Sequence, residues 1–369
     1  MSMYYDEAQA RDLVVRAGHM LQERGLVERT WGNISARISD TLFVITPSGL
    51  AYEDLRPEQL ALYDLSDGSW QGPCKPSSEK GIHADAYRLR PDISFVIHTH
   101  QDMASICGIK GEALDVGADL PGGKVPCAAY GLPSTGKLRR AVAGELEAEP
   151  RCQALLMRRH GALCLGRDME EAFRLAAELE EDCARRFHAL VREPEAQSSL
   201  PQLGDSFRDG DYFILKRGGQ EQKCSIYRKN GDDTAELHAA IYKNFQAQCI
   251  LHCRDPYVCQ VSGRLRRLRP MLDDLAQIAG ADILCVPAEA EKVLKALEGR
   301  SAVLLRECGA LCLGEAPDEA LAVQRLLEKG CRAQAYAWAV KGCRPLSYGD
   351  ALLQRLIYVK KYSKKKQRG

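Results

Sequence analysis

The sequence lacks any long uninterrupted apolar run. No segment of its 369 residues approaches the 18 or more apolar residues that a membrane-spanning helix needs. It also lacks a dominant charge, since 51 Lys and Arg oppose 50 Asp and Glu for a formal net charge of +1. This balance does not favour a nucleic acid or an acidic partner. The one basic stretch, residues 360–368, is typical of a solvated chain end.

The first residues lack the apolar stretch of a signal peptide, because Asp6, Glu7 and Arg11 interrupt it. Without an export signal we expect a cytoplasmic protein whose 15 cysteines are reduced thiols. No two cysteines form a CxxC pair, which argues against a cysteine-built zinc finger. Several, such as Cys164, lie within apolar strings where cysteine behaves as a small hydrophobic residue.

The chain repeats itself. Residues 157–166 (Met-Arg-Arg-His-Gly-Ala-Leu-Cys-Leu-Gly) match residues 305–314 (Leu-Arg-Glu-Cys-Gly-Ala-Leu-Cys-Leu-Gly). A second match joins residues 83–87 to residues 238–242, in the same order and at a similar spacing. Two ordered matches indicate an internal duplication.

The boundary between the copies falls in a polar stretch with two prolines, which suits a linker. We therefore predict a first domain at 1–191, a linker at 192–205 and a second domain at 206–369. The second copy is shortened: it shows nothing similar to residues 10–50, and we expect it to restart near Asp211.

Helix and strand patterns alternate in the first copy. Apolar spacing and turn signals predict the following elements: helices at 6–24, at 79–89 with Ser78 as N-cap, and at 169–190, and strands at 42–46, 93–98 and 154–157. Mixed elements of this kind predict an α/β fold in which helices cover a sheet.

Three histidines and a glutamate are candidates for a metal site. His98 and His100 end a predicted strand at positions i and i+2, so both imidazoles face the same way. His160 precedes a glycine, which lets the backbone pass close to a ligand. Glu79 follows two serines at a predicted helix N-terminus, where the helix dipole keeps a carboxylate ionised and N–H groups can hold phosphate.

Five sequence blocks, in this order and spacing, resemble the class II aldolase/adducin family. They are Thr-Trp-Gly-Asn-Ile-Ser-Ala-Arg at 30–37, Ile-Thr-Pro-Ser-Gly at 45–49, Pro-Ser-Ser-Glu at 76–79, Arg-Pro-Asp-Ile at 90–93 with His-Thr-His at 98–100, and Arg-His-Gly-Ala at 159–162. The pattern is similar to that of fuculose-phosphate and related ketose-phosphate aldolases. The resemblance implies an α/β/α sandwich around a mixed, largely antiparallel sheet, present twice, and assembly as a ring of four.

The resemblance also implies roles for individual residues. His98, His100 and His160 would bind zinc, with Glu79 as the remaining metal neighbour and the acid/base. The implied phosphate pocket consists of Thr30, Asn33, Ser48, Gly49, Ser77 and Ser78. Tyr130 matches a tyrosine that such aldolases present from a neighbouring subunit as a proton donor. Manganese or cobalt could replace zinc with these ligands.

The second copy has lost most of these residues. His252 stands at the place of His98, but Arg254, Cys308 and Thr234 replace His100, His160 and Glu79, in that order. A guanidinium has no lone pair to donate to a metal. We expect a silent scaffold that completes the oligomer, so that two chains imitate a ring of four. The second copy has no tyrosine corresponding to Tyr130 (Val286 follows Cys285 there), which leaves the proton donor open.

The leading functional hypothesis is reversible cleavage of a ketose 1-phosphate, a small phosphorylated sugar, into dihydroxyacetone phosphate and an aldehyde, with zinc as Lewis acid. One alternative keeps the site and changes the reaction to dehydration, decarboxylation or 4-epimerisation, although the epimerases of this family usually carry Asp where Glu79 stands. The other alternative is a metal-free, adducin-like binding protein.

Overall fold

The computed structural model describes residues 4–27, 30–116, 123–195 and 201–366, with side chains up to residue 360. The chain divides into two compact units, Met1–Leu190 and Val191–Gly369. Part of the predicted linker (196–200) lies outside the described residues, as do the side chains of most of the basic stretch at 360–368.

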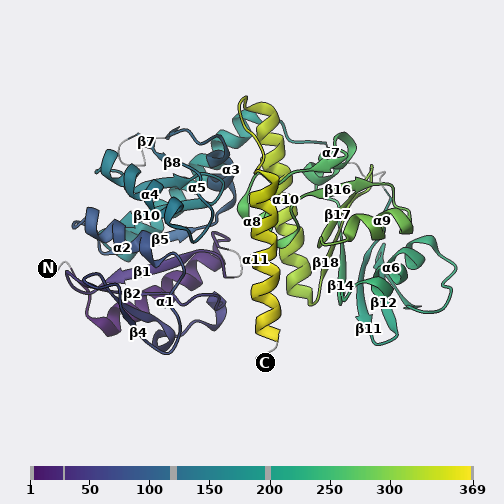
Figure 1. The fold of residues 1–369 in the computed structure, drawn as a ribbon. Helices are drawn as coiled ribbons and strands as arrows, with labels where there is room; N and C mark the ends of the chain where they lie inside the picture. The colour runs from purple at the N-terminus through teal and green to yellow at the C-terminus, as the bar shows by residue number, and fades with distance from the viewer. Residues whose placement is uncertain (1–3, 28–29, 117–122, 196–200, 367–369) are drawn as a thin grey trace. The chain divides into compact units, whose positions relative to one another are not determined.

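The first unit is built on an eight-stranded sheet (Figure 1). Its strands are β1 (Asn33–Arg37), β2 (Leu42–Ile45), β3 (Ala61–Asp64), β4 (Trp70–Gln71), β5 (Phe95–Thr99), β8 (Cys127–Ala128), β9 (Ala154–Met157) and β10 (Gly161–Gly166). They follow the order β4-β3-β2-β1-β5-β10-β9-β8, in which β8 and β9 are parallel and the other pairs with a printed register are antiparallel. A separate pair joins β6 (Leu114–Asp115) to β7 (Lys124–Val125).

Helices cover both faces of this sheet. They are α1 (Glu7–Glu23), α2 (Lys80–Leu89), α3 (Asp102–Cys107), α4 (Gly136–Ala148) and α5 (Met169–Leu190), with 3-10 turns η1 (Tyr52–Asp54), η2 (Pro57–Gln59) and η3 (Gly108–Lys110). Helices α1, α3 and α5 pack together on one side, and α2 and α4 contact each other on the other side. The result is a three-layer α/β/α sandwich.

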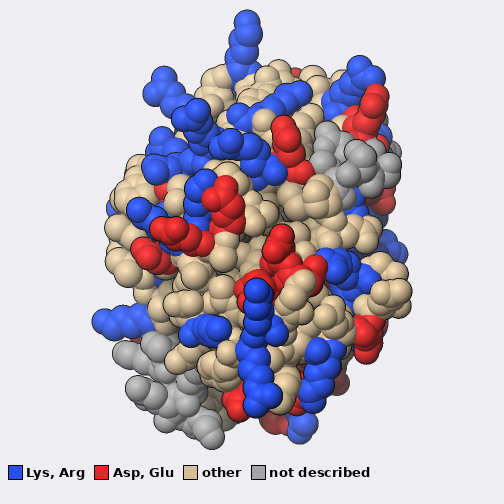
Figure 2. Space-filling model, turned by 90° about the vertical axis from the view of Figure 1, so that its right-hand side faces the viewer, with Lys and Arg blue, Asp and Glu red and all other residues tan. Residues whose placement is uncertain are grey.

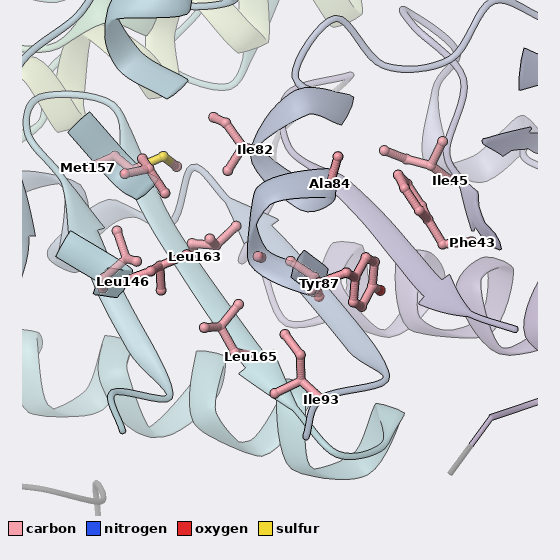
Figure 3. Packing of buried hydrophobic residues seen from close by; sticks show 14 of the residues in the cluster. Phe43, Ile45, Ile82, Ala84, Tyr87, Ile93, Leu146, Met157, Leu163 and Leu165 are labelled. Atoms are coloured by element: carbon pink, nitrogen blue, oxygen red, sulfur yellow. The ribbon is translucent and has the colours of Figure 1, made fainter. Parts of the chain in front are cut away.

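The core beneath α2 shows why the helix lies where it does (Figure 3). Its buried residues Ile82 and Tyr87 pack in one apolar cluster with Phe43 of β2 and Leu163 of β10. The Phe43 and Tyr87 rings have centroids 5.2 Å apart. The apolar face of α2 therefore fixes the N-terminal end of the helix, and with it Glu79, above the sheet.

The second unit repeats this architecture. Its strands are β11 (Asp205–Asp209), β12 (Tyr212–Arg217), β13 (Gln220–Ser225), β14 (Cys249–Cys253), β15 (Arg267–Leu268), β16 (Ile283–Val286), β17 (Ala302–Leu305) and β18 (Gly309–Gly314). They follow the order β13-β12-β11-β14-β18-β17-β16-β15, in which β16 and β17 are parallel, as β8 and β9 are in the first sheet.

Helices again lie on two sides of the second sheet. They are α6 (Asp233–Asn244), α7 (Pro256–Arg264), α8 (Asp273–Ile278), α9 (Ala290–Leu297), α10 (Pro317–Ala339) and α11 (Tyr348–Lys366). Helices α6 and α9 contact each other, while α10 contacts β14, β18, α7 and α8, and α11 packs on α8. The predicted α/β/α sandwich, present twice, is confirmed.

The prediction that the second copy lacks a counterpart of residues 10–50 and restarts near Asp211 is wrong for the strands. Strand β11 begins at Asp205 and pairs with β12 and β14 as β1 pairs with β2 and β5. The sequence signal is faint, because little more than the Ser-x-Arg pattern of Ser35 and Arg37 recurs, at Ser206 and Arg208. Pairing depends on backbone hydrogen bonds and alternating burial, which many sequences satisfy. Among the described residues of this unit, no helix precedes β11 as α1 precedes β1.

The surface agrees with the near-zero net charge. Basic and acidic side chains are both spread over the face shown in Figure 2. In the part of the chain that the structure describes, no helix combines the length and the apolar character that crossing a membrane requires.

Candidate metal centre

His98 is held in the middle of the first sheet. It lies on β5, opposite Asn33 of β1 on one side and Leu163 of β10 on the other. Its Nδ1 is 2.9 Å from the carbonyl oxygen of Ala162. Because a carbonyl only accepts, Nδ1 is the donor, which leaves Nε2 as the nitrogen that can bind a metal, the arrangement of a metal-ligating histidine.

His160 is presented by a tight turn between β9 and β10. The preceding Arg159 has φ +66°, in the left-handed region, and the N–H of His160 donates to the carbonyl of Met157 at 2.9 Å. A Cβ on the following Gly161 would lie only 2.0 Å from the backbone oxygen of Thr99. Glycine is therefore required here, because β10 passes too close to the end of β5 for any side chain.

The structure brings His98, His100 and His160 together. One ring nitrogen from each lies within 4.8 Å of the other two. Geometry then places a point within about 2.8 Å (4.8 Å divided by √3) of all three, close to the usual zinc–nitrogen bond of about 2.0–2.1 Å. All three rings are buried, with exposed fractions of 1%, 7% and 3%. Three convergent imidazoles beside a carboxylate fit a divalent metal of the zinc type.

Glu79 faces the histidines with both carboxylate oxygens. Oε2 is 3.3 Å from Nε2 of His98, and Oε1 is 3.2 Å from Nε2 of His160. The amide of Asn33 donates to Oε2, and the backbone N–H of Ser134 donates to Oε1, both at 3.2 Å. Burial raises the pKa of Glu79, but the charge and hydrogen bonds of the two histidines outweigh it and bring the pKa well below its usual value.

The start of helix α2 differs from the prediction by one residue. Glu79, not Ser78, is the N-cap, and it makes no side-chain cap hydrogen bond, because its carboxylate is turned to the histidines. Instead the hydroxyl of Ser77 accepts from the N–H of Glu79 at 3.2 Å. The N-cap side chain of α2 therefore contacts the histidines and does not cap its own helix.

The residues of the predicted phosphate pocket lie on neighbouring segments. The hydroxyl of Ser78 is 2.7 Å from that of Ser134, the N–H of Ser48 donates to the carbonyl of Lys75, Gly49 has φ +74°, and Thr30 is exposed. Asn33 differs from the others, because it is buried and its side chain contacts Glu79 and His83. A phosphate role for these residues stays a prediction.

Comparison with known proteins identifies the chain. Residues 12–186 and 212–335 both match the family described as the class II aldolase and adducin N-terminal domain. The chain belongs to the class II aldolase/adducin family. The two matched segments agree with the duplication read from the sequence.

A curated relative within this family is the 5-methylthioribulose-1-phosphate/5-deoxyribulose-1-phosphate aldolase of Rhodospirillum rubrum, with 35% identity over 187 residues, 49% of this chain and 82% of the relative. Similar solved structures include an L-fuculose 1-phosphate aldolase, with 26% identity, a TM-score of 0.45 and coverage of 51% of this chain and 89% of that one. Another is L-fuculose-1-phosphate aldolase from Thermus thermophilus, with 27% identity, a TM-score of 0.41 and coverage of 48% and 92%.

A pocket opens beside Glu79 in this class II aldolase unit. It has a volume of about 220 Å³, and its polar and charged lining includes Ser78, Glu79, Lys80, Ser134, Thr135 and Arg139. Burial lowers the pKa of Lys80, and the charges of Lys75 and Arg139 lower it further. Arg139 is itself paired with Asp85 at 2.6 Å, so the two lysines are the cations beside the site that favour an anionic ligand.

Sequence reasoning missed Lys80, Ser134, Thr135 and Arg139 as pocket residues. A signal was present in Ser-Thr-Gly at 134–136, because Thr135 caps helix α4 by accepting from the N–H of Leu138. The sequence does not predict that the N-terminal end of α4 lies next to the N-terminal end of α2.

Tyr130, the predicted proton donor, follows β8 and is half-buried. The guanidinium of Arg159 lies over its ring, 5.5 Å from the centroid. The link places Tyr130 near the turn that carries His160. Its role toward a neighbouring subunit stays a prediction.

The corresponding place in the second unit is closed to a metal. The N–H of Leu203 donates to Nδ1 of His252 at 3.1 Å, and Nε2 of His252 donates to the carbonyl of Cys308 at 2.7 Å. Both ring nitrogens of His252 therefore form hydrogen bonds with backbone groups. The hydroxyl of Thr234, at the position of Glu79, accepts from Arg217 at 3.0 Å. Among the described residues, His98, His100 and His160 form the single group of three or more histidine, cysteine or carboxylate side chains close enough together to share a metal ion.

Proposed function

We propose that this protein is a metal-dependent aldolase that cleaves a ketose 1-phosphate into dihydroxyacetone phosphate and an aldehyde. The observation that carries the proposal is the meeting of His98, His100 and His160 with the Glu79 carboxylate in one buried site. Membership of the class II aldolase/adducin family supports it. Because the three histidines and Glu79 are all retained, we favour an enzyme over an adducin-like binding protein.

Zinc, or manganese or cobalt in its place, would be held by the three histidines and would supply Lewis-acid polarisation of the substrate carbonyl. Cleavage between C3 and C4 requires that the C4 hydroxyl lose its proton and that C3 gain one. Glu79 is placed to exchange the proton at C3, since its carboxylate lies at the histidine cluster and is kept ionised. We assign the C4 hydroxyl to Tyr130 of the same chain, whose ring lies against Arg159, next to His160.

Phosphate would bind at the cationic side of the site. The pocket beside Glu79 carries Lys80 and the predicted phosphate residue Ser78, and the N-terminal ends of α2 and α4 meet there. Arg139 also lines this pocket, where its guanidinium is paired with Asp85. Helix N-termini and cations both favour a phosphate dianion. Remote binding of this group would hold C3 and C4 next to Glu79.

The named activity of the curated relative suggests the first substrates to test, 5-deoxyribulose 1-phosphate and its 5-methylthio analogue. Cleavage between C3 and C4 of the former gives dihydroxyacetone phosphate and acetaldehyde. The 5-substituent leaves with the two-carbon aldehyde. A class II aldolase with this specificity would not need groups that recognise a hydroxyl at C5.

Duplication suggests how the protein assembles. We propose that two chains form a closed ring of four sandwich domains, with two active sites and two scaffold domains, as the shared sheet order of the units permits. Light scattering coupled to gel filtration should give twice the mass of one chain. A monomer, or a tetramer of whole chains, would contradict this arrangement.

The activity is tested with the full chain loaded with one equivalent of zinc. Dihydroxyacetone phosphate is detected with a coupled dehydrogenase over a panel of ketose 1-phosphates. We expect Glu79→Gln to lower kcat by about 10²–10⁴-fold while the protein stays folded. Thr234→Val, the matched change in the second unit, should leave kcat within about two-fold.

Two results would overturn the proposal. Formation of another product without dihydroxyacetone phosphate would assign the site to dehydration, decarboxylation or epimerisation. Metal content below about one-tenth equivalent after purification without chelator would favour a binding protein.

A further inference from the structure

A chain of buried hydrogen bonds leads away from the catalytic carboxylate. The amide of Asn33 bonds Oε2 of Glu79 at 3.2 Å, and its Oδ1 lies 2.5 Å from Nε2 of His83. On the other side of the imidazole, Nδ1 of His83 is 2.6 Å from the hydroxyl of Ser35, which is 2.8 Å from the hydroxyl of Tyr87. The His83 side chain is fully buried beneath α2.

The carboxylate fixes the direction of every bond in this chain. The NH₂ group of Asn33 donates to Oε2 of Glu79, so its oxygen is the end that faces His83. That oxygen only accepts, so Nε2 of His83 must carry the proton and Nδ1 must accept. The hydroxyls of Ser35 and Tyr87 then donate in turn toward the imidazole.

The second unit contains half of the same chain. There the hydroxyl of Ser206 is 2.7 Å from Nδ1 of His238 and 2.9 Å from the hydroxyl of Tyr242. Gly204 stands at the position of Asn33, two residues before the serine, and Nε2 of His238 has no hydrogen-bond partner among the described residues. The serine–histidine–tyrosine part is thus present in both units, whereas the asparagine occurs only where there is a catalytic carboxylate to hold.

We propose that His83 is a positioning residue for the aldolase reaction, acting through Asn33 on Glu79. An asparagine amide is nearly symmetric in shape, so only its partners decide which end faces which way. The N–H of His83 holds the oxygen end of Asn33, and this leaves the NH₂ end for Glu79. Without His83 the amide can turn over and present its oxygen to the carboxylate, which repels Glu79 from its place. This inference rests on the proposed function.

A matched pair of variants separates positioning from stability. His83→Ala and His238→Ala remove equally buried rings with the same serine and tyrosine partners, so both should lower the melting temperature of their units to a similar extent. We expect only His83→Ala to reduce kcat, by about 10–100-fold as for residues that orient active-site groups, with KM changed by less than about two-fold. His83→Gln, whose amide can donate to Asn33, should recover part of the loss. An equal effect of His83→Ala and His238→Ala on kcat would overturn the inference.

A second measurement does not depend on activity. The sequence has only eight histidines, so ¹⁵N-histidine labelling of the zinc-loaded protein resolves individual rings. The signals lost in His83→Ala identify His83, and in the wild-type protein they should report a neutral ring protonated at Nε2. Protonation at Nδ1 would overturn the inference whatever the activity. If the wild-type protein cleaves no ketose phosphate, the proposed function fails, and the tautomer still decides whether Asn33 is oriented as described.

Discussion

Zinc should stabilise one half of this protein and leave the other unchanged. In the first unit, His98, His100 and His160 converge in a buried cluster that a metal can bind in the folded state only. In the second unit, both nitrogens of His252 are bonded to backbone groups. Adding zinc to metal-free protein therefore shifts the folding equilibrium of the first unit alone.

The size of the shift follows from the size of the unit. At a free zinc concentration about 100 times the dissociation constant, binding adds about 2.7 kcal/mol to the free energy of unfolding. The 190 residues of Met1–Leu190 give an unfolding entropy of about 0.4 kcal/mol/K, at about 2.1 cal/mol/K per residue. The melting temperature of this unit should therefore rise by about 7 °C.

Differential scanning calorimetry of the full chain, with and without zinc, measures the shift. The His160→Ala variant, which removes one ligand, identifies the transition of the first unit by abolishing most of its response. Hydrogen exchange adds a local readout: zinc should increase protection in β5 and β10 but not in β14 and β18. A similar shift in both transitions, or an undiminished shift in His160→Ala, would refute the reasoning.

Three further predictions concern the turn that carries His160 and two buried groups of the second unit. Gly161→Ala should cost about 3 kcal/mol in unfolding free energy and abolish stoichiometric metal binding, because its Cβ would lie 2.0 Å from a backbone oxygen of β5. The control Gly144→Ala, in open space on α4, should instead stabilise the protein by about 0.5–1 kcal/mol. Equal responses of the two variants in denaturant titrations would contradict this contrast. Burial lowers the pKa of His238 from 6.5 to about 3, so between these pH values the unfolded chain binds a proton that the folded chain does not. The free energy of unfolding of the second unit should therefore fall by about 1.4 kcal/mol per pH unit from pH 6.5 down to pH 3. In His238→Gln this dependence on pH should be weaker, and an unchanged dependence would reject the assignment. Lys329→Met should cost about 3–5 kcal/mol because it leaves the buried Asp274, 2.8 Å from the Lys329 ammonium, without its counter-charge, and a double variant with Asp274→Leu should recover most of the loss.

Local patterns predicted much of the first unit. The helix predicted at 6–24 is Glu7–Glu23, and that at 169–190 has these bounds, because both have an apolar face at helical spacing and clear ends. The strand at 154–157 is also found as predicted. The cap of α2 was misplaced, since capping statistics favour serine whereas the site uses Glu79.

The beginning of the second unit was harder to predict than the first unit. The second copy was expected to restart near Asp211, so strand β11 was missed, because the turn and phosphate motifs that mark the first copy are absent there. The place of β11 is decided by pairing with β14, a contact between segments about 40 residues apart that no local pattern encodes. Ser206 was the overlooked clue, because its hydroxyl contacts His238, which the repeat had already matched to His83.

By itself the sequence determined the duplication, the α/β class and the identity of the metal-site candidates, because repeats, periodicity and short motifs are properties of neighbouring residues. Only the tertiary structure decided that three histidines from two distant segments converge, two of them against the Glu79 carboxylate, and that Asn33 links this carboxylate to His83. It also decided that the one metal-site histidine retained in the second unit, His252, is sealed by backbone groups. The reason is physical: ligand geometry and hydrogen-bond direction depend on which strands the chain brings side by side, and that is settled by burial and pairing over long distances in sequence.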